Sequence, residues 1–257
     1  MLLIKTQDIM PTPSFCGETG RSLAFYLAME EHVAASLSRI LPEGFTEAFF
    51  IWQVPPSVIF GHNQEMSAEV NVRYCEENGI SMFRRKSGGG CVYADRGNIM
   101  LSAVSSETSV NLVFSRFLER LSLSLRQAGL PAVRSEHNDV LVDGRKVSGN
   151  ACFLTKDASI VHGTLLYDVD LVEMARAITP SEEKLRSHGV RSVRARVANL
   201  KDIAGASAAV RDIEALKRHV LASFCPERQV YTLSGDDIDR IERLAEAYTD
   251  KSYITKK

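Results

Sequence analysis

Residues 84–98 read Arg-Arg-Lys-Ser-Gly-Gly-Gly-Cys-Val-Tyr-Ala-Asp-Arg-Gly-Asn, a basic, glycine-rich turn between two apolar segments of strand length. The three glycines at 88–90 carry no Cβ, so their N–H groups can approach a ligand closely and adopt positive φ without steric cost. Arg84, Arg85 and Lys86 come before them, separated from the glycines only by Ser87, and guanidinium groups match the paired oxygens of a carboxylate or phosphate. The stretch therefore predicts an anion-binding loop, with a solvated glycine-rich hairpin as the alternative.

A second stretch, residues 137–153, predicts a tight hairpin. Apolar residues flank an Asp-Gly pair at 143–144, a dipeptide whose tolerance of positive φ suits a type I′ turn. Ideal strand alternation places Lys146 and Ser148 on one face and Val147 on the other. A buried Lys146 would need a negative partner, whereas an exposed one needs none, so spacing alone favours a solvated lysine.

Three ordered motifs resemble those of lipoate-protein ligases in the biotin/lipoate ligase superfamily. Residues 84–98 fit Arg-Arg-x-Ser-Gly-Gly-Gly-x-Val-x-x-Asp-x-Gly-Asn, and residues 138–149 fit Asn-Asp-Val-x-Val-x-Gly-Arg-Lys-Val-Ser-Gly. The third motif is His-Gly-Thr-Leu-Leu at residues 162–166. The likeness covers roughly residues 20–200, because it extends to further matching segments at 27–31, 51–52 and 187–200.

The strand and helix patterns predict an α+β fold with a mostly antiparallel or mixed sheet flanked by helices. The resemblance implies the same fold, since these ligases are similar to the catalytic domains of biotin ligases and class II tRNA synthetases. We expect a catalytic domain over residues 1–205 and a short helical tail over residues 206–257 packed on it. Strands are expected at 48–53, 57–61, 80–85, 98–104 and in several segments between 132 and 168, and helices at 21–39, 71–78, 113–125, 171–178, 211–223 and 236–247.

The resemblance implies that the protein attaches lipoate to a lysine of a lipoyl carrier domain through a lipoyl-adenylate. Because the acid must attack the α-phosphate of ATP, a cation between the two anions has to offset their repulsion. The lysine that matches the family's catalytic lysine is Lys146. Asp139 is the second implied catalytic residue, and together with Asn138 it would hold the phosphates and Mg²⁺. The resemblance implies three sets of binding residues. The ATP-binding residues are Arg85, Gly90, Cys91, Val92, Tyr93, Asn138 and Lys146. The lipoate-binding residues are Arg85, Ser87, Gly88, Gly89, Gly90, Lys146, His162, Gly163 and Thr164, and the adenylate-binding loop includes Ser192, Val193 and Arg194.

The implied partners are lipoyl domains of 2-oxoacid dehydrogenase complexes or the glycine cleavage H protein. Such ligases carry an accessory domain, for which we expect the amphipathic tail helices after residue 210 to substitute; a separately encoded accessory protein is the alternative.

A rival function is an octanoyl or lipoyl transferase, which would take its acyl group from an acyl carrier protein or another lipoylated protein through a cysteine thioester. Residues 130–137, which precede the lysine motif, contain no cysteine. That leaves Cys91 and Cys152, for which small apolar packing is the favoured role. Likewise, His162 is favoured as a core residue over a general base. A third candidate function is a module that binds lipoyl groups without catalysing a reaction.

The composition disfavours several other classes. The 257 residues carry a formal net charge of −1, so no global field attracts nucleic acid or an anionic membrane. The basic stretch 184–196 lacks interleaved aromatic residues for base stacking, which favours the adenylate loop. The five cysteines show no Cys-x-x-Cys spacing, which argues against a disulfide framework and a zinc site. Since the sequence shows neither a signal peptide nor a long apolar span, we predict a cytoplasmic protein.

Overall fold

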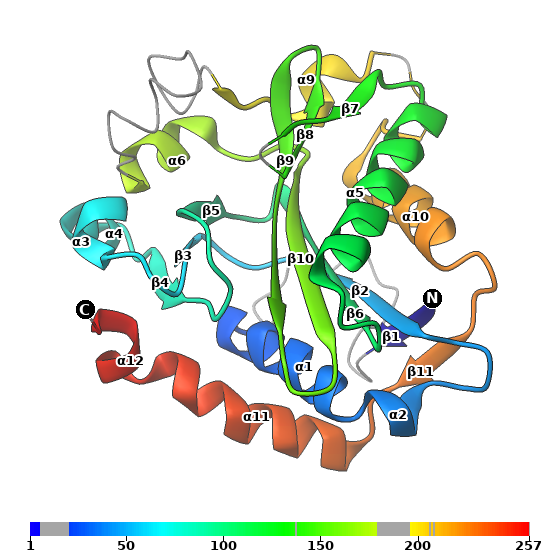
Figure 1. Cartoon of the computed structure of the whole chain (residues 1–257). Helices are drawn as coiled ribbons and strands as arrows, with labels where there is room; N and C mark the ends of the chain where they lie inside the picture. The colour runs from blue at the N-terminus through cyan, green and yellow to red at the C-terminus, as the bar shows by residue number, and fades with distance from the viewer. Residues whose placement is uncertain (6–20, 137, 179–195, 206, 208, 257) are drawn as a thin grey trace.

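The computed structural model describes residues 1–5, 21–136, 138–178, 196–205, 207 and 209–256, and confirms the α+β architecture (Figure 1). The central strands of its main sheet pair antiparallel, whereas β1 runs parallel to both of its neighbours. The sheet is therefore mixed and mostly antiparallel, as predicted. Its eight strands within these ranges are, in spatial order, β11 (Val230–Thr232), β1 (Leu2–Lys5), β2 (Glu47–Trp52), β6 (Asn98–Ser105), β10 (Ser159–Leu166), β9 (Arg145–Leu154), β8 (Asp139–Val142) and β7 (Ala132–Arg134).

Helices cover both faces of the main sheet (Figure 1). On one face, α1 (Leu23–Ala35) lies alongside α11 (Gly235–Thr249), and on the other α5 (Val110–Gln127) packs against α10 (Ile213–Phe224). Helix α10 contributes to the same apolar core as α5, so residues beyond 205 complete that core. The division of the chain at residue 205 stays a prediction.

The two cores explain why strand β2 is apolar along its length. Phe50 packs into the core under α1, and the preceding Phe49 packs into the core under α5. A strand covered on both faces reads as a continuous apolar run because neither face meets water. Helix α1 is buried nearly all round for a similar reason, since the sheet lies on one side and α11 on the other. The expected helix over 21–39 is split at Ser36, after which α2 (Leu37–Ile40) follows.

A smaller three-stranded sheet carries the glycine-rich loop. Its strands have the order β4 (Ser81–Arg84), β3 (Ser57–Phe60) and β5 (Val92–Ala94), and the loop joins β4 to β5. Helices α4 (Val72–Glu77) and α6 (Leu171–Ala177) pack against it. The described chain also contains α3 (Met66–Glu69), α9 (Leu200–Ile203) and α12 (Lys251–Thr255), and none of its helices is long and apolar enough to cross a membrane.

The β8–β9 hairpin has the predicted turn and an irregularity that was not predicted. Asp143 and Gly144 both have positive φ, 50° and 75°, as a type I′ turn requires. Leu141 pairs with Lys146, but Val140 pairs with Ser148, so Val147 is an extra residue in β9. This β-bulge interrupts the alternation expected over residues 146–148, because a bulge lets two successive side chains oppose one residue of the partner strand. Val147 and Ser148 are both fully buried.

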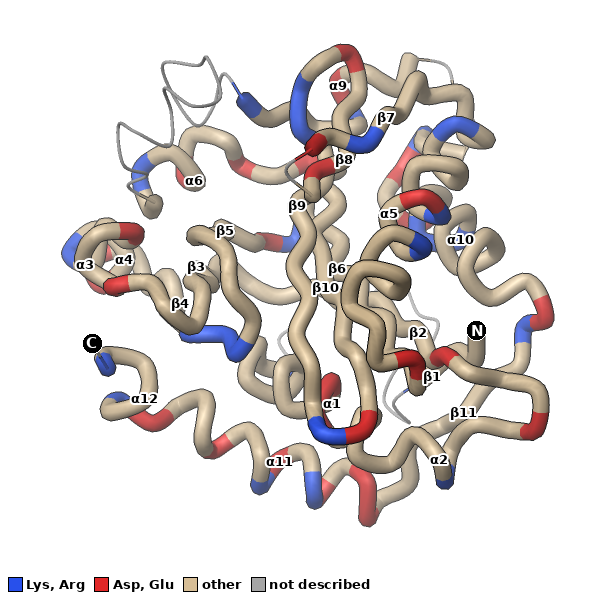
Figure 2. The backbone as a smooth tube through the Cα atoms, viewed as in Figure 1, with Lys and Arg blue, Asp and Glu red and all other residues tan. Residues whose placement is uncertain are grey.

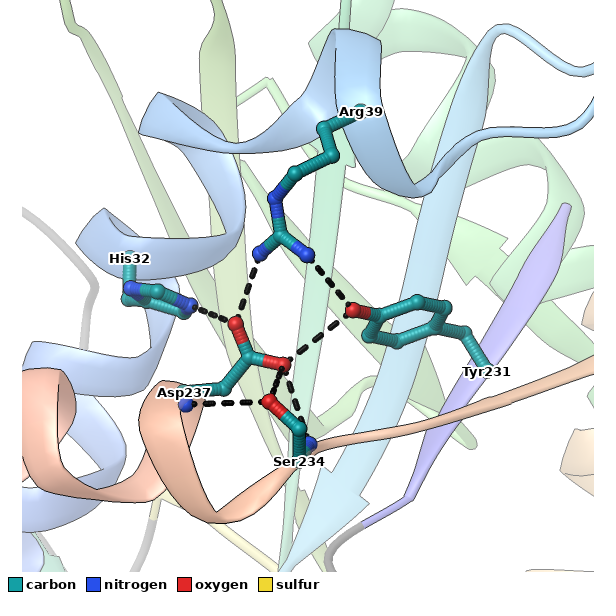
Figure 3. Close-up of polar contacts among 5 residues, drawn as sticks. All are labelled: His32, Arg39, Tyr231, Ser234 and Asp237. Carbon is teal, nitrogen blue, oxygen red and sulfur yellow. Dashed lines mark hydrogen bonds and ion pairs between the residues drawn. The ribbon is translucent and has the colours of Figure 1, made fainter.

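A buried carboxylate ties the start of α11 to helices α1 and α2 and to strand β11 (Figure 3). Asp237 Oδ1 lies 2.9 Å from His32 Nε2 and accepts from Arg39 Nη2 at 2.6 Å, while Oδ2 accepts from Tyr231 Oη at 3.1 Å. Ser234 completes a capping box with the same carboxylate. Burial by itself raises the pKa of Asp237, but hydrogen bonds from Ser234, His32 and Arg39 outweigh it and hold that pKa well below its ordinary value. Helix α11 is thus anchored at its N-terminus by a charged cap.

Candidate active site

A cavity of about 290 Å³ lies between the glycine-rich loop and the β9–β10 hairpin. The structure brings most of the predicted site residues to its walls. Ser87, Gly88 and Tyr93 do not line it, and residues 192–194 of the predicted adenylate loop fall outside the described ranges. The predicted residues that line it are Arg85, Gly89, Gly90, Cys91, Val92, Asn138, Asp139, Lys146, His162, Gly163 and Thr164, and those that the sequence did not single out for the site are Leu27, Trp52, Ile59, Met100, Gly149, Asn150, Ala151 and Arg196.

At one end of the cavity, a carboxylate holds two cations. Asp139 Oδ1 lies 2.8 Å from Lys146 Nζ, and Asp139 Oδ2 accepts from Arg196 Nη2 at 2.6 Å. The Lys146 side chain is 21% exposed, so the solvated lysine favoured by spacing alone is wrong. The ammonium reaches over Gly149, where an added Cβ would lie 2.5 Å from Nζ. A side chain at position 149 would require the end of the lysine to shift.

Arg196 was not singled out from the sequence, and backbone contacts explain its place. Val197 forms a parallel bridge with Lys146, and Ala198 N donates to Lys146 O at 2.9 Å. These contacts bring the chain that follows the predicted adenylate loop alongside β9. Two signals were available: Arg196 ends the basic stretch, although such stretches are usually solvated, and it lies within the segment 187–200 that resembles the family.

The deeper wall of the cavity is apolar and ends in a buried hydrogen-bonded relay. Trp52, Leu27 and Met100 are each at most 5% exposed. Trp52 Nε1 donates to Ser102 Oγ at 2.9 Å, and Ser102 Oγ donates to Glu30 Oε1 at 2.6 Å. Such a wall accepts a hydrocarbon chain, since every polar atom in the relay already has a partner.

The same relay continues through a histidine to the glycine-rich loop. Glu30 Oε2 lies 2.9 Å from His162 Nδ1, and His162 Nε2 lies 2.6 Å from Ser87 Oγ. Serine, histidine and glutamate in this order resemble an acyl-transfer triad. Ser87, however, is fully buried, and its Oγ accepts from Arg85 Nε at 2.9 Å, so this oxygen is not presented to the cavity. The arrangement fixes the loop rather than supplying a nucleophile.

Arg85, in the basic run before the glycines, binds backbone carbonyls of the protein itself. Arg85 is buried and donates to Ile59 O at 3.0 Å, Gly88 O at 2.6 Å and Gly90 O at 2.8 Å. Burial lowers the pKa of Arg85 to about 10, which leaves the guanidinium charged at neutral pH. Arg85 therefore shapes the loop while its positive charge borders the cavity.

Arg84 and Lys86 do not line the cavity, so the prediction that the whole run grips an anion directly is wrong for these two residues. In Figure 2 the blue segment after β4 lies between the small sheet and helices α11 and α12, both of which contact β4. Close packing also fixes the loop from the other side: Gly89 has φ of 89°, and an added Cβ at Gly61 would lie 2.0 Å from Gly89 O. The loop N–H groups remain the candidate anion donors.

The two cysteines near the motifs differ in position. Cys91 lines the cavity, and its backbone N donates to Glu69 Oε2 at 2.9 Å. Cys152 does not line it and packs against the core under α5, where burial raises the pKa of its thiol to about 11. A thiol with a raised pKa is a poor nucleophile, which agrees with the packing role predicted for Cys152. No described group of three or more His, Cys, Asp or Glu side chains could hold a metal ion.

The mixed α+β domain encloses a cavity lined by apolar side chains together with three cations, Arg85, Lys146 and Arg196, and one carboxylate, Asp139. The chain belongs to the lipoyl protein ligase A/B catalytic domain family, whose model matches residues 22–225. It is 41% identical over 177 residues to the lipoate-protein ligase LplJ of Bacillus subtilis, which is 68% of this chain and 52% of the relative. It is 34% identical over 223 residues to lipoate–protein ligase 1 of Staphylococcus aureus, or 85% and 65% of the two chains. The chain thus spans about half to two thirds of the length of these relatives.

Solved structures of lipoate-protein ligases share the fold. A bipartite lipoate protein ligase from Thermoplasma acidophilum, described with its E2 lipoyl domain, superposes with a TM-score of 0.79 at 25% identity and covers 99% of this chain and 95% of its own. A lipoate-protein ligase A bound with ATP gives a TM-score of 0.76 at 24% identity, covering 90% and 93% of the two chains. This likeness confirms the predicted lipoate-ligase fold.

Proposed function

We propose that the chain catalyses the ATP-dependent attachment of lipoate to a lysine of a lipoyl carrier domain, through a lipoyl-adenylate. One observation carries the proposal: the same cavity is lined by the partly exposed Lys146 ammonium and by the buried apolar side chains of Leu27, Trp52 and Met100. Lipoate has the matching form, because a carboxylate ends its apolar chain. The cavity volume of about 290 Å³ is near the lower limit of roughly 300 Å³ for small-molecule sites.

Both steps of this reaction need a cation at the carboxylate end. First, a lipoate oxygen attacks the α-phosphorus of ATP, and the bond to pyrophosphate breaks. The acceptor amine then attacks the acyl carbon, AMP leaves with the electrons of the C–O bond, and the amine loses one proton. Two unit charges about 4 Å apart repel by roughly 4 kcal/mol at an effective dielectric constant of 20. The charges of Lys146 and Arg196, held by Asp139 at the cavity, offset this repulsion.

One cavity carboxylate is of the kind that would hold a magnesium ion entering with the nucleotide. Asp139 is the one carboxylate among the described cavity residues, and each of its oxygens already contacts a cation. Mg²⁺ keeps several waters and is commonly bound through one or two carboxylates together with substrate phosphates. Asp139 is therefore the residue that would hold the ion, with Asn138 beside it, and when bound Mg²⁺ would neutralise phosphate charge.

The acceptors we propose are lipoyl domains of 2-oxoacid dehydrogenase complexes or the glycine cleavage H protein. Support comes from the family and from the Thermoplasma ligase that was described with its E2 lipoyl domain. An octanoyl or lipoyl transferase is the second candidate, because Cys91 lines the cavity. Against it, His162, the histidine of the cavity wall, is engaged by Ser87 and Glu30 on its two ring nitrogens.

A paired assay tests the two candidates. Purified protein is incubated with an apo lipoyl domain, first with lipoate, ATP and Mg²⁺ and then with octanoyl carrier protein alone, and the mass of the acceptor is followed. A lipoyl mass increase only with ATP, together with lipoate-dependent exchange of labelled pyrophosphate into ATP, is expected. Acylation from the carrier protein without ATP, with no pyrophosphate exchange, would replace the ligase by the transferase. An unmodified acceptor in both arms, with lipoate bound, would indicate a binding module.

A further inference from the structure

We propose that the C-terminal segment α11–α12 positions the glycine-rich loop, and that Arg84 is the positioning residue through which it acts. The inference rests on the proposed function for its kinetic readout, whereas its structural readout is independent of activity.

Arg84 joins the end of the chain to the turn beside the loop. Arg84 is 1% exposed. Nη2 donates to Ile254 O at 2.9 Å and to Lys256 O at 2.7 Å, and Nε lies 3.1 Å from Tyr253 O. On its other side, Nη1 donates to His62 O at 2.9 Å and to Gln64 O at 2.6 Å. The acceptors in all these contacts are backbone carbonyls, so one planar cation holds two segments distant in sequence.

The turn at 61–64 passes this restraint on to the loop. His62 O accepts from Arg84, while His62 N donates to Ser87 O at 2.9 Å. Ser87 in turn contacts His162 in the cavity wall. A continuous series of hydrogen bonds therefore runs from the carbonyls of α12 through Arg84 and the turn to the glycine-rich loop.

A second tie connects the tail to the same short run. Lys86 Nζ donates to Glu31 Oε2 at 2.5 Å, and Tyr248 Oη of α11 donates to Glu31 Oε1 at 2.5 Å. Lys86 Nζ also lies 5.7 Å from the centre of the Tyr248 ring. Residues 84 and 86 are thus held by the tail, and Arg85 between them organises the glycines.

Helix α11 is also held by contacts that do not involve Arg84, so the positioning of the loop can be tested separately from the stability of the fold. Helix α11 is fixed at its N-terminus by Asp237, far along the chain from the carbonyls that Arg84 holds. Helix α12 contains no fully buried residue. Loss of α12 should therefore leave α11 and both main cores in place while depriving Arg84 of three carbonyl partners. Buried N–H groups without acceptors are costly, so Arg84 and the 61–64 turn would rearrange.

The test uses the full chain, Arg84→Lys, and a variant that ends at Thr249. Lysine keeps the charge but cannot hold two segments with one planar fork. Hydrogen exchange of residues 87–92, steady-state kinetics and thermal unfolding are measured for each. Expected results are roughly tenfold faster exchange in the loop and roughly tenfold higher KM for lipoate, with kcat changing less.

Arg39→Lys is the matched control, because it removes the same fork from Asp237 at the opposite end of α11. It should lower the unfolding temperature and leave loop exchange and KM unchanged. Unaltered loop exchange in both Arg84→Lys and the shortened chain would overturn the inference, as would equal loop exchange in Arg39→Lys and Arg84→Lys. If the shortened chain does not fold, Arg84→Lys alone decides. If the wild type lacks ligase activity, the proposed function fails, and loop exchange still tests the positioning role.

Discussion

Two buried aspartates in this protein each hold two basic side chains, yet they stand in different surroundings. Asp139 pairs with Lys146 and Arg196 on the wall of a cavity. Asp237 pairs with His32 and Arg39, and Ser234 and Tyr231 fill its remaining hydrogen-bonding positions. The first arrangement leaves positive charge at a ligand-sized space, whereas the second closes on itself at a helix start. An ion pair therefore indicates a site only when its surroundings leave room for a further charged partner.

Replacing Lys146 should have the largest effect on activity. Lys146→Ala removes the cation nearest the expected junction of carboxylate and phosphate, and we expect adenylate formation to fall by at least about 10³-fold. The fold should persist, because Lys146 lies at a cavity and is partly exposed. Pyrophosphate exchange and thermal unfolding measure the two effects. Wild-type exchange rates in this variant would remove Lys146 from the mechanism.

Replacing each aspartate by asparagine should affect a different property, activity at Asp139 and stability at Asp237. Asp139→Asn keeps the shape but leaves Lys146 and Arg196 without a counter-charge, and we expect roughly 10- to 100-fold lower kcat/KM with a modest loss of stability. Asp237→Asn should instead lower the free energy of unfolding by about 2–3 kcal/mol, a value reduced because the Arg39 side chain is 50% exposed. Its activity per folded molecule should match that of the wild type. The reverse pattern in urea unfolding and kinetics would contradict this comparison.

A pH titration of stability sharpens the same contrast. The pKa of Asp237 is held below its ordinary value of 3.8, so its contribution to stability is fully present above that value and is lost as the pH falls toward the lower folded-state pKa. Urea unfolding between pH 6 and pH 3 should show the wild type losing more stability than Asp237→Asn at the acidic end. Parallel curves for the two proteins would show that Asp237 is not the titrating group.

The sequence predicted the fold well where local patterns decide it. Apolar runs such as residues 48–53 gave strands because both faces of the sheet are covered, and the Asp-Gly pair gave the hairpin turn. The motifs also indicated most of the cavity wall, although the roles of the individual residues stay predictions.

The remaining features depend on partners that no local pattern specifies. Lys146 follows the register of a strand with a bulge at Val147, and its ammonium lies over Gly149, where no side chain stands in its way. The role of Arg84 depends on carbonyls about 170 residues away, at Tyr253 and Ile254. A basic run reads the same in sequence whether it faces a ligand or the protein's own backbone, so only the tertiary structure separates the two cases.

Replacing the cysteines should have the smallest effect and decides between the two candidate reactions. Cys152→Ser exchanges a protonated, packed thiol for a hydroxyl, and we expect a stability loss of about 1 kcal/mol with ligase activity retained. Cys91→Ser alters the cavity wall itself, so a change in KM of a few-fold at most is expected if its thiol has no chemical role.

Acylation of the lipoyl domain is followed in both variants, with intact-protein mass spectrometry of the wild type to detect an acyl-enzyme. An acyl group trapped on Cys91, together with loss of turnover in Cys91→Ser, would mean that the cavity works by thioester exchange. The cation pair at Asp139 would then bind the acyl chain's polar end rather than activate a carboxylate.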